Sequence, residues 1–237
     1  MADASGVFRA HGMNRPTTTS SGSLRAGTMR VLLPVKCFDR AKSRLSGVLE
    51  PAQRAHLASL LLHDVLDTLC SSSLVSEIWL VGSEPGLVPL AGEGKIRLLP
   101  LSRERGHAAD LTRALELLPL RPGEPVLILP ADVPLLSPAE LRELAGAHRG
   151  GGLVMCPAAC DGGTNALLFE PPLPMPLLFG DRSLSRHRQA ALERGVEVRV
   201  LDLPGLSRDI DRPEDLCWLA RQGRGGLSRG YARRLLA

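Results

Sequence analysis

Short apolar runs alternate with amphipathic stretches along most of this chain, and this alternation restricts its fold more than any other feature. Runs rich in Val, Ile and Leu predict buried strands at 30–35, 77–81, 95–99, 126–129, 153–156, 166–169 and 196–201. Apolar residues at helical spacing predict helices at 51–69, 108–118, 138–147 and 183–194, with a last helix after Asp211. The pattern therefore predicts an α/β fold with a mostly parallel central sheet and flanking helices.

Three regions of the chain differ in character. Residues 1–28 include a low-complexity run of Ser and Thr at 17–23, which predicts a disordered N-terminal tail. Residues 29–220 carry the alternating pattern and suit a single domain. Residues 221–237 hold five Arg and no acidic residue, and we expect them to form a basic C-terminal tail.

Charge and composition argue against several classes of protein. The net charge is +4, but the arginines of the two ends supply it and the middle of the chain is net negative. Aromatic residues make up only 3% of the chain, whereas a nucleic-acid binder more often interleaves them with a basic face. We find neither an apolar run of about 18 residues nor a secretory signal, so no membrane partner is expected. The five Cys lack metal-site spacing and are interpreted as reduced thiols of a cytoplasmic protein.

A cluster of cations follows the first predicted strand. Lys36, Lys42 and Arg44 lie there, although the whole chain has only three Lys, the third being Lys95. A compact ammonium on a flexible stem suits a polyphosphate, and the carboxyl ends of parallel strands are where α/β sheets bind ligands. The pattern favours anion binding over a merely solvated basic loop.

Two other segments bring carboxylates to strand ends. Asp132 follows the apolar run 126–129, where it could hold Mg²⁺ against substrate phosphates or simply bond its own backbone in a turn. Asp209 and Asp211 are two residues apart, so both could reach one metal ion in extended backbone. As an alternative, Asp211 could cap the last helix, with Glu214 completing a capping box.

Two small-residue segments have several interpretations. The segment Gly162–Asn165 could bind an anion through backbone N–H groups and the Thr164 hydroxyl, or could form a hairpin turn. Ser183 starts a predicted helix, either as its N-cap or as part of an anion site. His187 has no paired nucleophile in sequence and is interpreted as a surface or helix-packing residue.

These segments, in this order, resemble one family: the 2-phospho-L-lactate or phosphoenolpyruvate guanylyltransferases of deazaflavin coenzyme F-420 biosynthesis. The resemblance covers about residues 29–220 and rests on six segments: 34–36, 41–45, 129–141, 162–168, 179–187 and 209–216. The segment 129–141 alone would fit several nucleotidyltransferases. The combination of 162–168 with 179–187 and 209–216 is more specific.

The resemblance implies a Rossmann-like nucleotidyltransferase fold of the GT-A type. It implies that a phosphate oxygen of a small phospho-acid attacks the α-phosphorus of GTP, with Mg²⁺ as cofactor and pyrophosphate as leaving group. The partners would be GTP, the phospho-acid and a second copy of the chain in a homodimer. The roles implied for individual residues are metal binding by Asp132, Asp209 and Asp211; triphosphate binding by Lys36, Lys42 and Arg44; phospho-acid binding by Thr164, Gly180 and Ser183; and catalysis by Lys36 and Asp132.

Some alternatives stay open at this point. The acceptor could be phosphoenolpyruvate, 2-phospho-L-lactate or 3-phospho-D-glycerate. The segment 106–111 lacks the Asn that the family usually carries there, which bears on the guanine preference and leaves a non-catalytic nucleotide-binding protein as an alternative. Enzymes for molybdopterin or sugar phosphates usually carry a Gly-rich loop after the first strand, whereas this chain has Pro34-Val35-Lys36.

Overall fold

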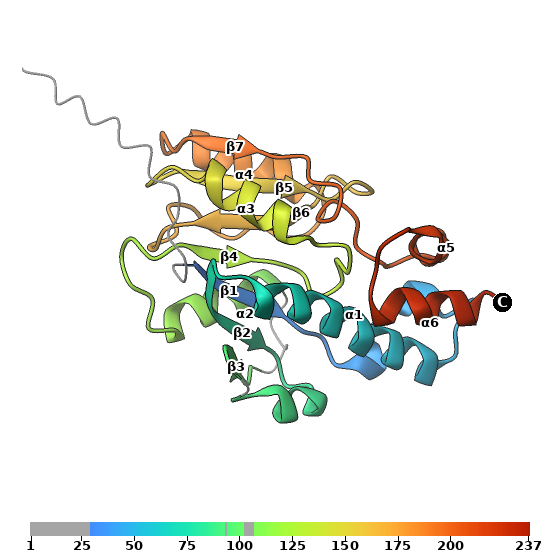
Figure 1. Cartoon of the computed structure of the whole chain (residues 1–237). Coiled ribbons are helices and arrows are strands. Elements are labelled where there is room, and N and C mark those ends of the chain that lie inside the picture. Colours follow the sequence, from blue (N-terminus) through green and yellow to red (C-terminus); the bar gives the residue numbers. More distant parts are fainter. Residues whose placement is uncertain (1–28, 93, 102–106) are drawn as a thin grey trace, which may run out of the picture.

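A seven-stranded sheet forms the centre of the molecule (Figure 1), in a computed structural model that describes residues 29–92, 94–101 and 107–237. The strand order is β3-β2-β1-β4-β6-β5-β7. Strand β6 runs antiparallel to both of its neighbours, and every other pair is parallel. The strands are β1 (Met29–Pro34), β2 (Val75–Val81), β3 (Ile96–Leu99), β4 (Val126–Ile128), β5 (Leu153–Pro157), β6 (Thr164–Phe169) and β7 (Val198–Val200).

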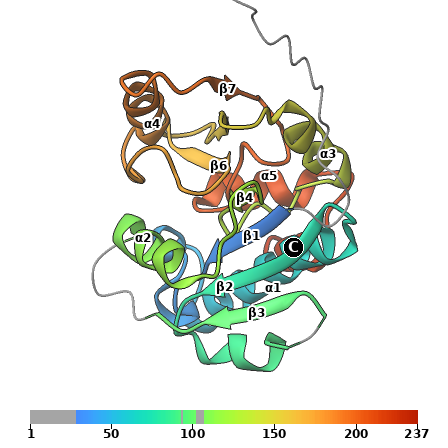
Figure 2. The ribbon, with the colours of Figure 1, turned by 90° about the vertical axis from the view of Figure 1, so that its left-hand side faces the viewer.

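Helices cover both faces of this sheet (Figure 2). On one face, α1 (Pro51–Ser71) and α3 (Pro138–Ala147) bury leucines such as Leu62 and Leu141 against the strands. On the other face, α2 (His107–Leu117) and α4 (Ser183–Leu192) pack with residues such as Leu111 and Ala191. Buried apolar runs on every central strand match this two-sided covering.

The elements expected from the sequence are present. Each predicted strand and helix lies within two residues of its expected bounds. Helix α3 begins as predicted, with Ser137 and Glu140 capping each other and Pro138 in the first helical position. Three short 3-10 helices were not predicted: Phe38–Arg40, Ser43–Leu45 and Pro85–Leu90. The predicted N-terminal tail, residues 1–28, lies outside the described residues.

The prediction of a basic tail at 221–237 is wrong. After α5 (Pro213–Arg221) the chain forms α6 (Leu227–Leu235), which packs against α1 and α5. Ala232 is fully buried in a third apolar cluster with Leu57 and Leu219, while the arginines of α6 lie around this contact. The arginines dominated the sequence pattern, and the few small apolar residues that dock the helix gave too weak a signal.

The buried carboxylate of Asp64, on α1, holds the first turn of α6. It accepts hydrogen bonds from the backbone N–H groups of Leu227 (2.8 Å) and Ser228 (3.0 Å) and from the Ser228 hydroxyl. Asp64→Ala would leave those buried donors without partners, so we expect the free energy of unfolding to fall by about 2–3 kcal/mol. Denaturant unfolding measures this. The exposed Asp67 on the same helix is the control, and equal losses in Asp64→Ala and Asp67→Ala would contradict the docking of α6.

The strand order indicates where on the sheet a ligand would bind. Strands β1, β2 and β3 follow one another toward one edge, while β4 lies on the other side of β1. The loops that leave β1 and β4 therefore diverge, and ligands of open α/β sheets bind in the crevice that such a reversal opens. Lys36 to Arg44 follow β1 and Asp132 follows β4, so both predicted segments lie at this crevice.

Within the described residues, none of the helices combines the length and the apolar character needed to cross a membrane.

Candidate active site

A cavity of about 600 Å³ opens at the carboxyl ends of β1 and β4. Five segments far apart in sequence meet around it, and they include every site residue that the sequence predicted. The lining residues with predicted roles are Lys36, Lys42, Arg44, Asp132, Thr164, Gly180, Ser183, Asp209 and Asp211. The fold therefore gathers the predicted residues into one place.

The loop after β1 is held against the end of β2. Gly82, directly after β2, packs closely against this loop: a Cβ atom at position 82 would lie 2.4 Å from the Val35 carbonyl oxygen. Glu84 accepts a hydrogen bond of 2.7 Å from the backbone N–H of Phe38. Lys36 is exposed at the cavity and forms no salt bridge with any residue that the structure describes. Its ammonium is therefore free to meet an anionic ligand.

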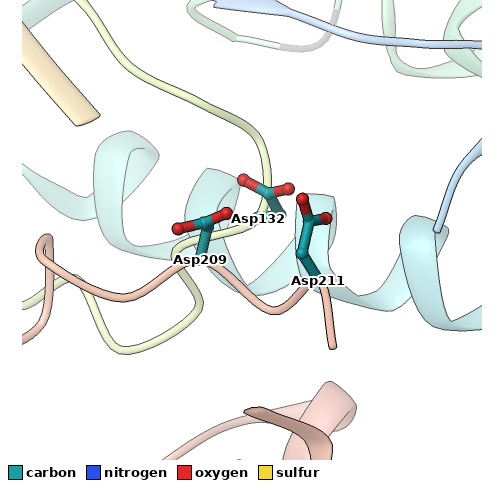
Figure 3. A group of neighbouring side chains, drawn as sticks. All are labelled: Asp132, Asp209 and Asp211. Carbon is teal, nitrogen blue, oxygen red and sulfur yellow. The ribbon is translucent and has the colours of Figure 1, made fainter. Parts of the chain in front are cut away.

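Three carboxylates meet at one point of the cavity (Figure 3). Asp132 comes from the loop after β4, and Asp209 and Asp211 come from the loop before α5. Each offers an oxygen that lies within 4.8 Å of the other two. Hard oxygen ligands in this number suit a divalent cation such as Mg²⁺, which commonly takes one or two carboxylates together with substrate phosphates.

The electrostatics of the cluster also fit a cation. Burial and the neighbouring carboxylates of Asp132 and Asp211 together raise the pKa of Asp209 to about 6, although the Lys42 charge acts against them. Burial acts in the same direction on Asp211, but the Lys42 ammonium and the Arg44 guanidinium outweigh it and lower its pKa. The charge of Asp209 is thus the least compensated of the cluster, and a bound cation would favour its ionised form.

Lys42 lies among the carboxylates. Its ammonium, on a side chain only 6% exposed, lies 2.5 Å from Asp132 Oδ2 and 3.0 Å from Asp211 Oδ1. Burial alone would lower the pKa of Lys42, but the two carboxylates raise it, so the ammonium stays charged. Sequence reasoning grouped Lys42 with Lys36 as a triphosphate ligand. In the structure its partners are the predicted metal ligands.

Arg44 is the most open of the three cations. Its side chain is 58% exposed and one guanidinium nitrogen lies 3.4 Å from Asp211 Oδ2. Such an exposed contact stabilises the fold little, which leaves Arg44 able to turn toward a ligand.

Among the described residues, two other than glycine have positive φ angles, and both lie in loops of this site. Lys42 has φ of 55° and Arg182, directly before Ser183, has φ of 47°. This left-handed conformation is costly for a residue with a side chain and tends to persist where surrounding structure and function require it. The two strained positions therefore support a functional role for both loops.

The alternative role considered for Asp211, as a helix cap, is not what the structure shows. Helix α5 begins at Pro213 with Arg212 as the residue before it. The capping carboxylate belongs to Asp215, which accepts from the backbone N–H groups of Arg212 (2.9 Å) and Asp211 (3.2 Å). Asp211 is therefore free to face the cavity.

A pair of hydroxyls also lines the cavity. Thr164, the first residue of β6, and Ser183, the first residue of α4, are both buried, and their hydroxyl oxygens lie 3.3 Å apart. Strands β5 and β6 form an antiparallel hairpin, so the segment 162–165 is a turn and also part of the cavity wall. The hairpin interpretation is therefore confirmed, whereas anion binding by this segment stays a prediction.

The backbone at the start of α4 is arranged differently from the prediction. The N–H groups of Ser183 and Leu184 are already bonded to the carbonyls of Gly180 and Gly162, so they are not free for an anion. Gly180 has open space around it, and its φ of 118° rather than a close approach requires glycine. The hydroxyls of Thr164 and Ser183, and not these two amides, are therefore the donors that we consider for an anion here.

Sequence reasoning missed His187 as part of the site. Its side chain is fully buried beneath the hydroxyl pair and bonds Thr164. The one available signal was its position four residues after Ser183, which places both side chains on one face of a helix. The altered segment at 106–111 stays undecided, because Gly106 lies outside the described residues.

Solved structures of other proteins share this fold. The crystal structure described as a nucleotide-diphospho-sugar transferase of Desulfovibrio desulfuricans superposes with a TM-score of 0.67 at 17% identity, covering 88% of this chain and 95% of that chain. Such a likeness shows the fold, which is the Rossmann-like, GT-A-type fold expected from the sequence.

The family follows from the sequence comparisons. A family model described as "Guanylyl transferase CofC like" matches residues 29–236, which includes α6. A phosphoenolpyruvate guanylyltransferase of Rubrobacter xylanophilus is 40% identical over 81% of this chain and 93% of its own length. A 2-phospho-L-lactate guanylyltransferase of Methanothermobacter thermautotrophicus is 32% identical over 86% of this chain and 89% of its length. This chain belongs to the CofC-like guanylyltransferase family.

Proposed function

We propose that this protein transfers GMP from GTP to a small phospho-acid and releases pyrophosphate, in the biosynthesis of coenzyme F-420. The observation that carries the proposal is one cavity that is lined by a free lysine, a carboxylate cluster and a hydroxyl pair. Triphosphate and metal fit the lysine and the carboxylates, and a small anionic acceptor fits the hydroxyls. The family membership supports the same reaction.

Phosphoenolpyruvate is the acceptor that we favour. The relative from Rubrobacter, at 40% identity, is named for it, whereas the relative named for 2-phospho-L-lactate is 32% identical. The two acids share a phosphate and a carboxylate, and both would present anionic oxygens to Thr164 and Ser183. 3-Phospho-D-glycerate remains an alternative with the same chemistry.

The proposed reaction does not require the protein to transfer a proton. The phosphate of the acceptor is already largely ionised at pH 7, so no general base is needed. Lys36 would bind the triphosphate and stabilise the charge that moves onto pyrophosphate, with Arg44 beside it. Thr164 and Ser183 would orient the acid so that its phosphate oxygen faces the α-phosphorus.

Asp132, Asp209 and Asp211 would hold Mg²⁺, which supplies charge neutralisation and alignment of the phosphates when bound. Lys42 forms ion pairs with the carboxylates of Asp132 and Asp211 and so holds both in position. We also propose that the protein acts in the cytoplasm as a homodimer, as the family resemblance implies.

A panel of acceptors tests this function. Pyrophosphate release is followed with GTP, Mg²⁺ and each of phosphoenolpyruvate, 2-phospho-L-lactate, 3-phospho-D-glycerate and a sugar phosphate. We expect release that depends on GTP and on a phospho-acid, fastest with phosphoenolpyruvate. Release with only the sugar phosphate would identify another class of nucleotidyltransferase. GTP binding without release for any acceptor would identify a non-catalytic nucleotide-binding protein.

Removal of either hydroxyl should affect the acceptor alone. Thr164→Val removes a donor for a charged oxygen, and Ser183→Ala removes the hydroxyl that is bonded to this donor, so we expect the KM for the acid to rise roughly 10- to 100-fold in each variant. The KM for GTP should change less than about 2-fold, because we assign GTP to the lysine and the carboxylate cluster. Steady-state kinetics with each substrate varied in turn measures both. If the kinetics for the acid are unchanged and only the Tm falls, the two hydroxyls have a structural role and do not bind the acid.

A further inference from the structure

The imidazole of His187 is bonded at both nitrogens beneath the acceptor side of the cavity. Its Nε2 lies 2.8 Å from the backbone nitrogen of Leu178, and its Nδ1 lies 3.1 Å from Thr164 Oγ1. The ring of Phe179 packs edge-on against it, with centroids 5.0 Å apart. The side chain is fully buried, so bulk water does not contact the ring.

The bond from Leu178 determines which nitrogen carries the hydrogen. A backbone N–H can only donate, so Nε2 must accept and has no hydrogen. Burial, with a smaller contribution from Arg186, lowers the pKa of His187 to about 4, so the ring is neutral near pH 7. A neutral ring with a bare Nε2 carries its hydrogen on Nδ1, and Nδ1 therefore donates to Thr164 Oγ1.

This donation decides what the hydroxyl pair can offer to a ligand. Thr164 Oγ1 accepts from His187 and from the Ser183 hydroxyl, which uses both of its lone pairs. Its own hydrogen has no acceptor among the residues that the structure describes. With the other tautomer, Thr164 would donate to Nδ1 and Ser183 would donate to Thr164, so neither hydroxyl hydrogen would remain for a ligand.

We propose that His187 is a positioning residue for the acceptor: it aims the Thr164 hydroxyl into the cavity as a donor for an anionic oxygen of the phospho-acid. This proposal rests on the proposed function of the same cavity. The chain of bonds runs from the Leu178 amide to the ring, then to Thr164 and on to the ligand. It explains how a wall whose nearest helix amides are already bonded can still recognise an anion.

His187→Gln is the test variant, because its side-chain oxygen can replace Nε2 as the partner of Leu178 while no donor remains at Nδ1. We expect the KM for phosphoenolpyruvate to rise about 10-fold, the effect of one hydrogen bond, with the KM for GTP within about 2-fold of wild type. In the Thr164→Val background the same substitution should add less than about 2-fold. His148→Gln, at another buried histidine outside the cavity, should lower the Tm without changing either KM.

A merely structural His187 would give a different result: its effect would persist in full on top of Thr164→Val, or the KM for GTP would rise in parallel. Either outcome would overturn the proposal. Nitrogen NMR of the wild-type protein labelled at histidine gives an independent readout, and a His187 ring protonated at Nε2 would also overturn it. If the wild type shows no acid-dependent pyrophosphate release, the proposed function fails, while the NMR still decides the bonding of His187.

Discussion

Asp132→Asn and Asp209→Asn should each lower kcat by at least about 100-fold while the protein still folds. Asparagine keeps the size of the side chain but removes the charge that a divalent cation requires, and the loss of a major electrostatic contribution is typically of this size. Asp209 faces the other two carboxylates directly, within the 4.8 Å that separates their ligand oxygens. Steady-state pyrophosphate release at saturating GTP and Mg²⁺ measures the effect. Asp202→Asn, at an exposed carboxylate outside the cavity, is the control.

Asp209→Asn and Asp211→Asn should change the stability of the protein in opposite directions, because the pKa values of the two carboxyls are shifted in opposite directions. The pKa of Asp209 is raised from 3.8 to about 6. The free energy of unfolding therefore falls as the pH rises through this range, and the full loss is present above about pH 6. Asp209→Asn removes that cost and should raise the unfolding free energy at pH 7 by on the order of 1 kcal/mol in the presence of a chelator. Higher stability combined with lost activity is typical of a functional residue.

Asp211→Asn should show the opposite effect on stability. The pKa of Asp211 is lowered by Lys42 and Arg44, so its ionised form stabilises the fold at every pH above its unfolded-state pKa. Its neutralisation should therefore lower the Tm at pH 7 as well as the activity. Thermal melts of both variants with a chelator test the pair. If Asp209→Asn melts lower than Asp211→Asn, the charge balance described for this cluster is wrong.

Lys36→Ala should weaken the use of GTP strongly, with kcat/KM for GTP falling about 100-fold. The ammonium of Lys36 is exposed at the cavity without a salt bridge to any described residue, so its charge is available to the triphosphate. Lys95→Ala is the matched control: that ammonium bonds the Ser72 carbonyl at 2.6 Å, away from the cavity. Equal kinetics in the two variants would remove Lys36 from the nucleotide site.

Lys42→Met should behave unlike Lys36→Ala because it leaves Asp132 and Asp211 without their buried cation. Removing one partner of a buried ion pair typically costs about 3–5 kcal/mol, so we expect a lower Tm in chelator. Mg²⁺ should then raise the Tm of the variant more than that of wild type, since a bound cation would compensate the same carboxylates. Thermal melts with and without Mg²⁺ measure this. An equal Mg²⁺ shift in both proteins would separate Lys42 from the metal site.

The local patterns of this sequence were sufficient for most of the fold. Continuous apolar runs identify strands buried on both faces, and Ser137 to Glu140 mark a helix start, because each signal is contained in a few neighbouring residues. Helix α6 was missed because its stability depends on contacts with α1, made by Asp64 far away in sequence. A helix whose apolar side is short cannot be distinguished from a basic tail by periodicity alone.

The site was likewise predicted only in part from the sequence. Asp132, Asp209 and Thr164 could be proposed from their positions at strand ends and in short motifs, since the topology of an α/β sheet brings such positions together. Which of the site's side chains contact one another could not be predicted from the sequence. That Lys42 bonds carboxylates while Lys36 does not, and that His187 supports Thr164, depends on side-chain directions that only the folded chain defines.

The most direct test of the central claim is phosphorus NMR of the products during turnover with GTP, Mg²⁺ and phosphoenolpyruvate. If the acceptor phosphate attacks the α-phosphorus of GTP, the spectrum will show free pyrophosphate together with two coupled signals of a new diphosphate that joins GMP to enolpyruvate. Both should appear at the same rate and vanish when either substrate is omitted. Formation of GDP and inorganic phosphate, or of pyrophosphate without the coupled pair, would contradict the proposed guanylyl transfer.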